Sequence, residues 1–440
     1  MSCRPGANAT IPRKVVHAIV FICRRKITPS VSNSIKTGPR LTQRHATLPI
    51  EVGLLTGGQD RHYAFGLALA LISSGVCLDF IGSDEVDSPE LHDTPKVTFL
   101  NLRGNQRRDA SPFRKVSRVL VYYIRLICYA ATARPKIFHI LWNNKFEVFD
   151  RTLLMLYYKL LRKKIALTAH NVNAGRRDST DTLFNRFTLK IQYRLTDHIF
   201  VHTEKMKREL LAEFGVLESA VSVIPYGINN AVPDTDLTPD EARERLGIKR
   251  EERTLLFFGS IAPYKGLEYL VAAFQQVLTR HADYRLIIAG LPKKGCETYL
   301  HEIQETISRG MSRGRVLQKI AYISDEETEV YFKAADVFVL PYTNIFQSGV
   351  LFLGYSFGLP VVAADVGSLK ENIIVGETGF LFRPEDPVDL ADTIETYFSS
   401  GLFKDLKRRR HEIRDYVNAR HSWDGVGRMT RTVYAELLRN

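Results

Sequence analysis

Residues 342–373, YTNIFQSGVLFLGYSFGLPVVAADVGSLKENI, contain the segment that decides the fold class of this chain. The apolar run just before them, AADVFVLPY (334–342), predicts a buried strand. A polar turn, NIFQSG (344–349), precedes a helix-length segment that stops at Gly358 and Pro360, and a second apolar run, PVVAAD, follows at once. Strand, turn, helix and strand in this order predict a βαβ unit of a parallel sheet.

The 344–349 turn lies at the carboxyl end of a predicted strand and opens a predicted helix. Ligands of open α/β sheets bind at this edge, and the free N–H groups of a helix N-terminus favour an anion. Gln347, Ser348 and Gly349 are therefore candidate phosphate contacts. An ordinary βα connection with no ligand is the alternative interpretation of the same residues.

A similar unit is predicted near the start of the ordered sequence, where LPIEVGLLTGG (48–58) reads as a strand with a tight exit. Gly57 and Gly58 would let the backbone approach a ligand closely, although a plain tight turn fits them equally well. Further along, the strand KIALTAHNV (164–172) brings His170 to the same edge of the sheet. A histidine at a strand end is usually structural, but a neutral imidazole there could hydrogen-bond a substrate hydroxyl.

The chain has 440 residues, more than one ordinary hydrophobic core accommodates, so two domains are expected. Strands and helices alternate over 48–230, and the alternation restarts at RTLLFFGSI (253–261) after a polar linker with prolines. We therefore predict an N-terminal domain at 48–230 and a C-terminal domain at 231–408. Residues 1–47 are expected to form a disordered basic extension, and GETGFLFRPED (376–386) predicts a hairpin-like segment.

The net charge of +13 is concentrated in two segments, residues 1–47 and 103–164. No motif that reads nucleic acid accompanies it, which argues against a nucleic-acid partner. A local basic face instead favours an anionic membrane surface or a phosphorylated acceptor. The helix predicted at 113–135 covers the sheet in one interpretation and also touches a membrane interface in the other. No apolar run is long enough to span a bilayer.

The cysteines are scattered through the chain without paired spacing, which argues against a disulfide framework and against a zinc site. This pattern favours a reducing compartment. We expect a cytoplasmic location, with peripheral contact at the inner face of the membrane. The five residues are Cys3, Cys23, Cys77, Cys128 and Cys296.

Several motifs together resemble those of the family 4 retaining glycosyltransferases, also described as glycosyl transferases group 1. VIPYGIN (223–229) resembles the VIPNGVD segment that closes the N-terminal domain of that family, and FFGSIAPYKGLEYLVAAF (257–274) resembles its glycine loop and following helix. YRLIIAG (284–290) matches a family strand, and GLPVVAADVGSLKENI with GETGFLF (358–382) resembles the family's donor-binding block. TAHNV (168–172) takes the place of the family's N-domain histidine.

This resemblance implies an α/β protein of the GT-B fold, in which two Rossmann-like domains face each other across a cleft. The C-terminal domain would bind most of a nucleotide-sugar donor, and a C-terminal helix at 409–440 would return to the N-terminal domain. The implied enzyme is a hexosyltransferase that retains the anomeric configuration, acts in polysaccharide or glycolipid biosynthesis, and needs no metal. The acceptor would be a glycan or a lipid-linked molecule.

The resemblance also assigns roles to single residues. Lys265 would contact the donor pyrophosphate and stabilise the leaving nucleoside diphosphate, and His170 would lie near the transferred sugar. These two residues are the candidate catalytic residues. The expected donor-binding residues are Gly57, Gly58, Gly259, Ser260, Lys265, Gln347, Ser348 and Gly349.

The chain departs from the family pattern at three positions. The family's two glutamates would fall at Ile345 and Leu353, and its loop arginine would fall at Ser260. Since the second glutamate normally holds the donor ribose, either Gln347 and Ser348 take over donor contacts or the site is impaired. The alternatives to an active transferase are a non-catalytic nucleotide- or carbohydrate-binding protein and a UDP-sugar epimerase of similar architecture.

Overall fold

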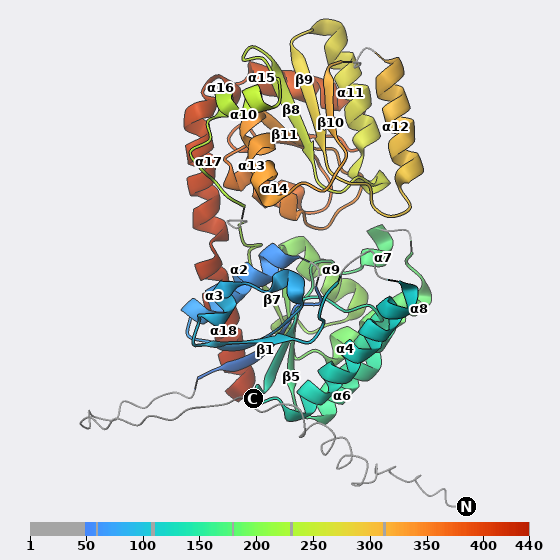
Figure 1. Ribbon diagram of the computed structural model, residues 1–440, viewed down its shortest axis with the longest axis vertical. Coiled ribbons are helices and arrows are strands. Elements are labelled where there is room, and N and C mark those ends of the chain that lie inside the picture. Colours follow the sequence, from blue (N-terminus) through green and yellow to red (C-terminus); the bar gives the residue numbers. More distant parts are fainter. Residues whose placement is uncertain are drawn as a thin grey trace, which may run out of the picture.

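The computed structural model describes residues 49–58, 60–106, 111–177, 180–228, 232–310 and 314–439. The basic extension expected at residues 1–47 lies outside these ranges. The described residues fold into two α/β domains stacked along the long axis of the molecule, with the C-terminal helix pair running down one side of both (Figure 1).

The N-terminal domain is built on a parallel sheet of seven described strands in the order β3-β2-β1-β4-β5-β6-β7. The central strands are buried along their length because helices cover both faces. The strands are β1 (Glu51–Leu55), β2 (Cys77–Gly82), β3 (Val97–Asn101), β4 (Ile137–Ile140), β5 (Lys164–Thr168), β6 (His198–Val201) and β7 (Val221–Val223).

Two helical layers enclose this sheet. One contains α4 (Pro112–Thr132), α6 (Met155–Leu160), α8 (Leu183–Leu195) and α9 (Glu204–Phe214), whose buried side chains share one apolar cluster. The other contains α2 (Arg61–Ser73), α3 (Pro89–His92) and the C-terminal α18 (Trp423–Arg439). The short helices α5 (Glu147–Phe149) and α7 (Ala174–Arg177) lie in connections.

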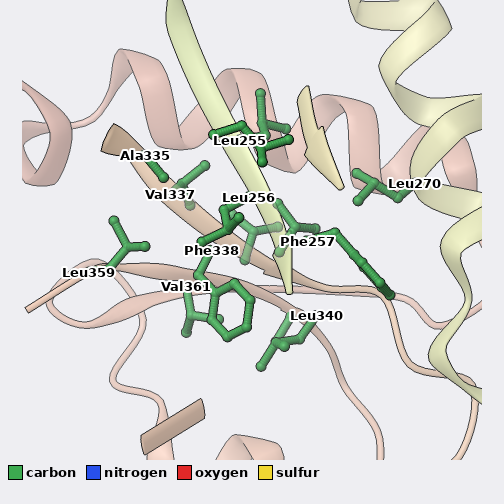
Figure 2. Packing of buried hydrophobic residues seen from close by; sticks show 14 of the residues in the cluster. Leu255, Leu256, Phe257, Leu270, Ala335, Val337, Phe338, Leu340, Leu359 and Val361 are labelled. Carbon is green, nitrogen blue, oxygen red and sulfur yellow. The ribbon is translucent and has the colours of Figure 1, made fainter. Parts of the chain in front are cut away.

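The C-terminal domain repeats the same strand order with six described strands, β10-β9-β8-β11-β12-β13. Its core packs β8 and β11 against the surrounding helices, as Figure 2 shows for Leu255, Phe257 and Phe338. The strands are β8 (Arg253–Phe258), β9 (Tyr284–Ala289), β10 (Val316–Lys319), β11 (Val337–Leu340), β12 (Val361–Ala364) and β13 (Gly379–Phe382). The expectation of a hairpin-like segment at 376–386 is wrong. This segment contains β13, which pairs in parallel with β12.

Most helices of this domain lie on the faces of its sheet. α14 immediately follows the 344–349 turn and packs against α17. The helices are α10 (Pro239–Arg245), α11 (Leu267–Arg280), α12 (Glu297–Arg309), α13 (Asp325–Ala334), α14 (Gly349–Ser356), α15 (Pro387–Ser399), α16 (Gly401–Lys404) and α17 (Leu406–His421).

The chain crosses back to the N-terminal domain between α17 and α18. Ile413 and Val417 of α17 are buried in the C-terminal core, whereas Val433 and Tyr434 of α18 are buried in the N-terminal one. The domain boundary expected at 408/409 therefore falls inside α17, and the crossing itself lies near Ser422. Across the described residues, the longest helices remain too short or too polar to cross a lipid bilayer.

Candidate functional site

A cavity of about 1000 Å³ lies between the two domains. Both sheets have the strand order of a doubly wound fold. In such a fold the crevice opens between the two strands whose connecting helices cross to opposite sides of the sheet. In the C-terminal domain this point lies between β8 and β11. Lys265 follows β8 and the 344–349 turn follows β11, so residues far apart in sequence reach the same cavity wall.

The position of Lys265 is set by a tight loop between β8 and α11. Pro263–Lys265 forms a single 3-10 turn, and Gly266 follows with φ of 65°. A Cβ atom at Gly266 would lie 1.8 Å from the carbonyl oxygen of Pro341, so only glycine fits this close approach to the β11 exit. The loop thereby holds Lys265 against the strand end, with only 6% of its surface exposed.

A chain of hydrogen bonds joins Lys265 to Ser348, the residue just before α14. The Lys265 ammonium donates to the Tyr342 hydroxyl over 2.6 Å, and that hydroxyl lies 3.2 Å from Ser348 Oγ. Burial raises the pKa of Tyr342 above its ordinary value, so the phenol stays neutral. Because an ammonium can only donate, the Tyr342 oxygen accepts from Lys265, and either hydroxyl can donate in the contact between Tyr342 and Ser348.

The first turn of α14 adds backbone donors to this wall. Ser348 is the N-cap residue, but its side chain makes no capping bond to the helix and instead faces Tyr342. The N-terminal N–H groups of a helix without a cap are available to an anion. Gly349 is required here, since a Cβ atom would lie 2.8 Å from the Tyr226 hydroxyl, which itself donates to Asp60 over 3.0 Å.

The carboxylates of the family pattern are absent from this wall. Ile345 and Leu353 both line the cavity and are each 6% exposed, so the two expected glutamate positions are apolar. Gln347 also lines the cavity, and its Oε1 atom is buried without a hydrogen-bond partner. A buried amide oxygen without a partner is costly and fits a missing donor such as a ligand hydroxyl or N–H.

The 344–349 turn also holds the two domains together. Phe346 leaves the C-terminal domain and is buried in the N-terminal apolar cluster. Close by, Thr203 Oγ1 and Ser368 Oγ are 2.8 Å apart, and Lys205 Nζ donates to the Gly367 carbonyl over 3.2 Å. The cavity wall is therefore fixed relative to the N-terminal domain by packing as well as by the linker.

The Gly57–Gly58 turn lies at the carboxyl end of β1 in the N-terminal domain. Both glycines have positive φ, 62° and 71°. A Cβ atom at Gly57 would lie 2.5 Å from the carbonyl oxygen of Trp142, and one at Gly58 would lie 2.7 Å from Nη1 of Arg103. Within the described residues, the turn faces these two neighbours rather than the interdomain cavity.

His170 lies in an aromatic cluster behind the cavity. Its ring stacks on Trp142 with centroids 4.3 Å apart, and its Nδ1 is 3.1 Å from Nε2 of His202. His202 Nδ1 contacts the Ile224 carbonyl at 3.2 Å and must donate to it, so its Nε2 accepts from His170. Burial and the neighbouring His202 lower the pKa of His170, which leaves a neutral ring whose Nε2 lone pair has no partner.

The structure thus brings together part of the set predicted from sequence. Lys265, Gln347, Ser348 and Gly349 line one cavity. The remaining predicted positions, Gly57, Gly58, His170, Gly259 and Ser260, are not among the residues that line it. Gly259 lies just behind the wall, because a Cβ atom there would be 3.6 Å from Val350 of α14.

Three residues of the site were missed from sequence. Tyr342 contacts Lys265 and Ser348, and Tyr226, which donates to Asp60 of its own domain, stacks on Phe352 of α14 in the other domain. A signal for Tyr226 was present, because it stands where the family segment VIPNGVD has asparagine. Tyr342 was visible only as the last residue of a strand-forming run.

Two parallel doubly wound domains around a shared cleft define a protein of the GT-B fold. Sucrose-phosphate synthase from Thermosynechococcus elongatus is similar in structure, with a TM-score of 0.71 and 19% sequence identity over 88% of this chain and 99% of that one. The Anabaena protein Alr3699/HepE, solved in complex with UDP and glucose, has a TM-score of 0.67 and 16% identity over 88% and 99% of the two chains. At such identities the similarity establishes the fold alone.

Family comparisons are more specific. Residues 56–232 match the model described as Glycosyltransferase Family 4, and residues 252–400 match that of Glycosyl transferases group 1. A D-inositol 3-phosphate glycosyltransferase from Corynebacterium diphtheriae is 30% identical over 61% of this chain, and the match spans 64% of the length of that relative. The chain belongs to the family 4 glycosyltransferases, as its motifs predicted.

Proposed function

We propose that the protein transfers a hexosyl unit from a nucleotide sugar to an acceptor hydroxyl with retention of the anomeric configuration. The observation that carries this proposal is the shared cavity wall of Lys265, Ser348 and the α14 N-terminus. One cation, one hydroxyl donor and free backbone N–H groups suit a diphosphate. The presence of UDP and UDP-glucose in structures of Alr3699/HepE supports a nucleotide-sugar donor on this fold.

In the proposed reaction, the bond between the anomeric carbon and the diphosphate oxygen breaks while the acceptor oxygen bonds to that carbon on the same face. The acceptor proton passes to the departing phosphate oxygen. Lys265 and the Ser348 hydroxyl stabilise the negative charge that develops on the leaving group. This charge stabilisation is the work that a metal ion does in other enzymes, so we expect transfer without added metal.

His170 has a role in binding the sugar in this scheme. His170 is not among the residues that line the cavity, so we propose that a bound sugar reaches its unpartnered Nε2 from behind Tyr63, and its lowered pKa keeps that lone pair available at neutral pH. The Gln347 amide oxygen is a second unpartnered acceptor and lies on the cavity wall. We propose that it contacts the donor near the position of the missing glutamates.

The experiment is an assay of the purified protein with UDP-, GDP- and ADP-sugars, with and without a chelator. We expect release of sugar from one donor, unchanged by the chelator, and loss of most of this activity in Lys265→Ala. Lys294→Ala, an exposed loop lysine of the same domain, is the matched control. Activity that disappears with the chelator, or that Lys265→Ala retains in full, contradicts the proposed mechanism.

We also propose that the acceptor belongs to polysaccharide or glycolipid synthesis at the cytoplasmic face of a membrane. The supporting observation is the outer surface of α4 and α8, which lie on the same side of the N-terminal sheet (Figure 1). Large apolar side chains are exposed there beside the basic residues: Phe113, Val116, Leu120, Ile124, Leu183, Phe184 and Phe187. Exposed apolar and cationic side chains together favour an anionic interface. Binding to anionic vesicles at low salt tests this part, and its absence would contradict it.

A second candidate function is binding without catalysis. The apolar side chains of Ile345 and Leu353, where the family has glutamates, favour it, because neither can hydrogen-bond a ribose or a sugar. The donor assay separates the two functions. A pure binder would bind a nucleotide sugar and release no sugar, whereas an epimerase would return an altered nucleotide sugar.

A further inference from the structure

A second cavity, of about 580 Å³, lies in the N-terminal domain between the β3 exit and α4. Four arginines line it, and we call it the arginine pocket: Arg103 from the loop after β3, and Arg114, Arg118 and Arg125 from α4. The three helical positions are four and seven residues apart, so they share one face of α4. This cavity has no lining residue in common with the interdomain cavity.

The positive charge of the arginine pocket is not neutralised by the described residues. Its described lining residues include no carboxylate, and none of the four guanidinium groups takes part in a described ion pair. Arg118 Nη1 donates to the Asn105 carbonyl over 2.7 Å, and Arg103 lies 5.1 Å from the centre of the Tyr122 ring. In the neighbouring 3-10 turn Asp84–Val86, Glu85 accepts from the Gln106 backbone N–H and Asp84 accepts from the Asn101 side chain.

Two guanidinium nitrogens of the pocket are buried without a partner, Nη1 of Arg103 and Nε of Arg118. Leaving a charged donor buried and unsatisfied costs free energy, and holding four cations together adds repulsion. Both costs fall when an anion enters. A single carboxylate would neutralise one of four charges, whereas a phosphate or diphosphate carries more charge and more acceptor oxygens for forked arginine contacts.

We propose that the arginine pocket binds a phosphate or diphosphate group of the acceptor. The proposal rests on the transferase function and adds the chemical class of its acceptor. The location supports it, because Arg103 packs against Gly58, at the edge of the N-terminal sheet where the strands end. The pocket therefore lies on the N-terminal domain, apart from the wall that carries Lys265.

The rim of the pocket favours a phosphate attached to an apolar chain. Val121 lines the pocket and is exposed, and Phe113 and Ile124 of the same helix are 82% and 62% exposed. An amphiphile could place its phosphate among the arginines and its chain along these side chains. The same chemistry could also come from a soluble phosphorylated acceptor, which the experiment distinguishes.

The test is a titration of the full chain with inorganic pyrophosphate while the nucleotide identified in the donor assay is held at saturation, so that the interdomain cavity is occupied, followed by sedimentation with vesicles that contain phosphatidic acid. Arg114→Gln with Arg125→Gln is the test variant, because both side chains are exposed and their loss should leave the fold intact. Arg428→Gln with Arg431→Gln on the exposed face of α18 removes the same charge from the same domain and is the control.

We expect the test variant to bind pyrophosphate at least tenfold more weakly than the wild type and the control. Loss of vesicle binding in the same variant would assign the phosphate to a lipid, and a loss confined to pyrophosphate would assign it to a soluble acceptor. Equal affinities of all three proteins for pyrophosphate would overturn the proposal. Donor cleavage without acceptor is measured in parallel, since it depends on Lys265 and fails only if the proposed function itself fails.

Discussion

At the scale of single residues, the site depends on how one buried lysine is held. Lys265 donates to a neutral phenol, and that phenol also contacts the Ser348 hydroxyl on the cavity wall. The three side chains form one hydrogen-bonded chain. We propose that this arrangement takes over part of the donor contacts that the family's glutamates would make.

Tyr342→Phe tests this hydrogen-bonded chain. The ring stays in place, but Lys265 loses its acceptor and Ser348 its hydrogen-bond partner, so we expect affinity for a nucleoside diphosphate to fall about fivefold, or about 1 kcal/mol. Tyr355→Phe is the matched control, a buried tyrosine of α14 whose hydroxyl is near Thr378, outside the cavity lining. Equal affinities of the two variants, measured by calorimetry, would show that the Tyr342 hydroxyl has no part in binding.

Buried histidines give the fold a defined response to acid. Burial lowers the pKa of His421 to about 4, while its Nδ1 donates to the Tyr226 carbonyl over 2.9 Å. The unfolded chain takes up this proton near pH 6.5, so stability is present above that pH and is lost as pH falls toward 4. Asp150, whose pKa burial raises to about 6, acts in the opposite direction.

His421→Asn isolates this effect, because the asparagine amide can replace the Nδ1 donor but does not titrate. Between pH 7 and pH 5 the wild type should lose about 2 kcal/mol more unfolding free energy than the variant. Urea denaturation followed by tryptophan fluorescence measures both proteins. An identical loss in the two would mean that His421 titrates normally in the folded state.

At the scale of elements, α18 brings the end of the chain back from the C-terminal domain to the N-terminal domain. Trp423 at its start donates from Nε1 to the Ile228 carbonyl over 2.8 Å. Its ring fills the space above two glycines, Gly66 of α2 and Gly227 of the linker. Further along, the Tyr434 hydroxyl lies 2.5 Å from His139 Nδ1 in the buried β4.

Gly66→Ala should disturb this packing. The added Cβ atom would lie 2.2 Å from Cε2 of Trp423, so the ring or the helix must shift, at a cost of about 1–3 kcal/mol. Gly425→Ala, also in a helix of this junction, meets only Ser422 Oγ at 3.4 Å and should be neutral or slightly stabilising. Thermal unfolding measures the difference in melting temperature between the two variants. The account is contradicted if this difference is absent, because Trp423 would then be loosely packed.

The elements themselves were largely predictable from sequence. Local patterns revealed the βαβ unit around 344–349 and the strand exits at Gly57 and Lys265, because strand and turn signals span only a few residues. The bond between Lys265 and Tyr342 joins residues 77 positions apart, and no local pattern indicates it. The burial of Phe346 in the other domain depends on how the domains meet, so it was equally hidden.

At the scale of the whole molecule, we propose that the interdomain cavity binds the donor and that the arginine pocket binds the acceptor phosphate. The interdomain cavity is lined by both basic and acidic side chains, among them Lys265, Arg61 and Asp60, whereas the described lining of the arginine pocket has four arginines and no carboxylate. Four of the basic residues in the segment 103–164 line this pocket. Contacts through Phe346 and α18 fix the position of one domain relative to the other. The proposed transfer from donor to acceptor requires such a fixed arrangement.

The central claim is that Lys265 and the 344–349 turn form a site for a nucleoside diphosphate. Calorimetric titration of UDP, GDP and ADP into the wild type, Lys265→Ala and Lys294→Ala tests it most directly. We predict that one nucleotide binds the wild type and Lys294→Ala equally, and binds Lys265→Ala at least tenfold more weakly because a buried charged contact is lost. Failure of all three nucleotides to bind the wild type, or equal binding to Lys265→Ala, would contradict the claim.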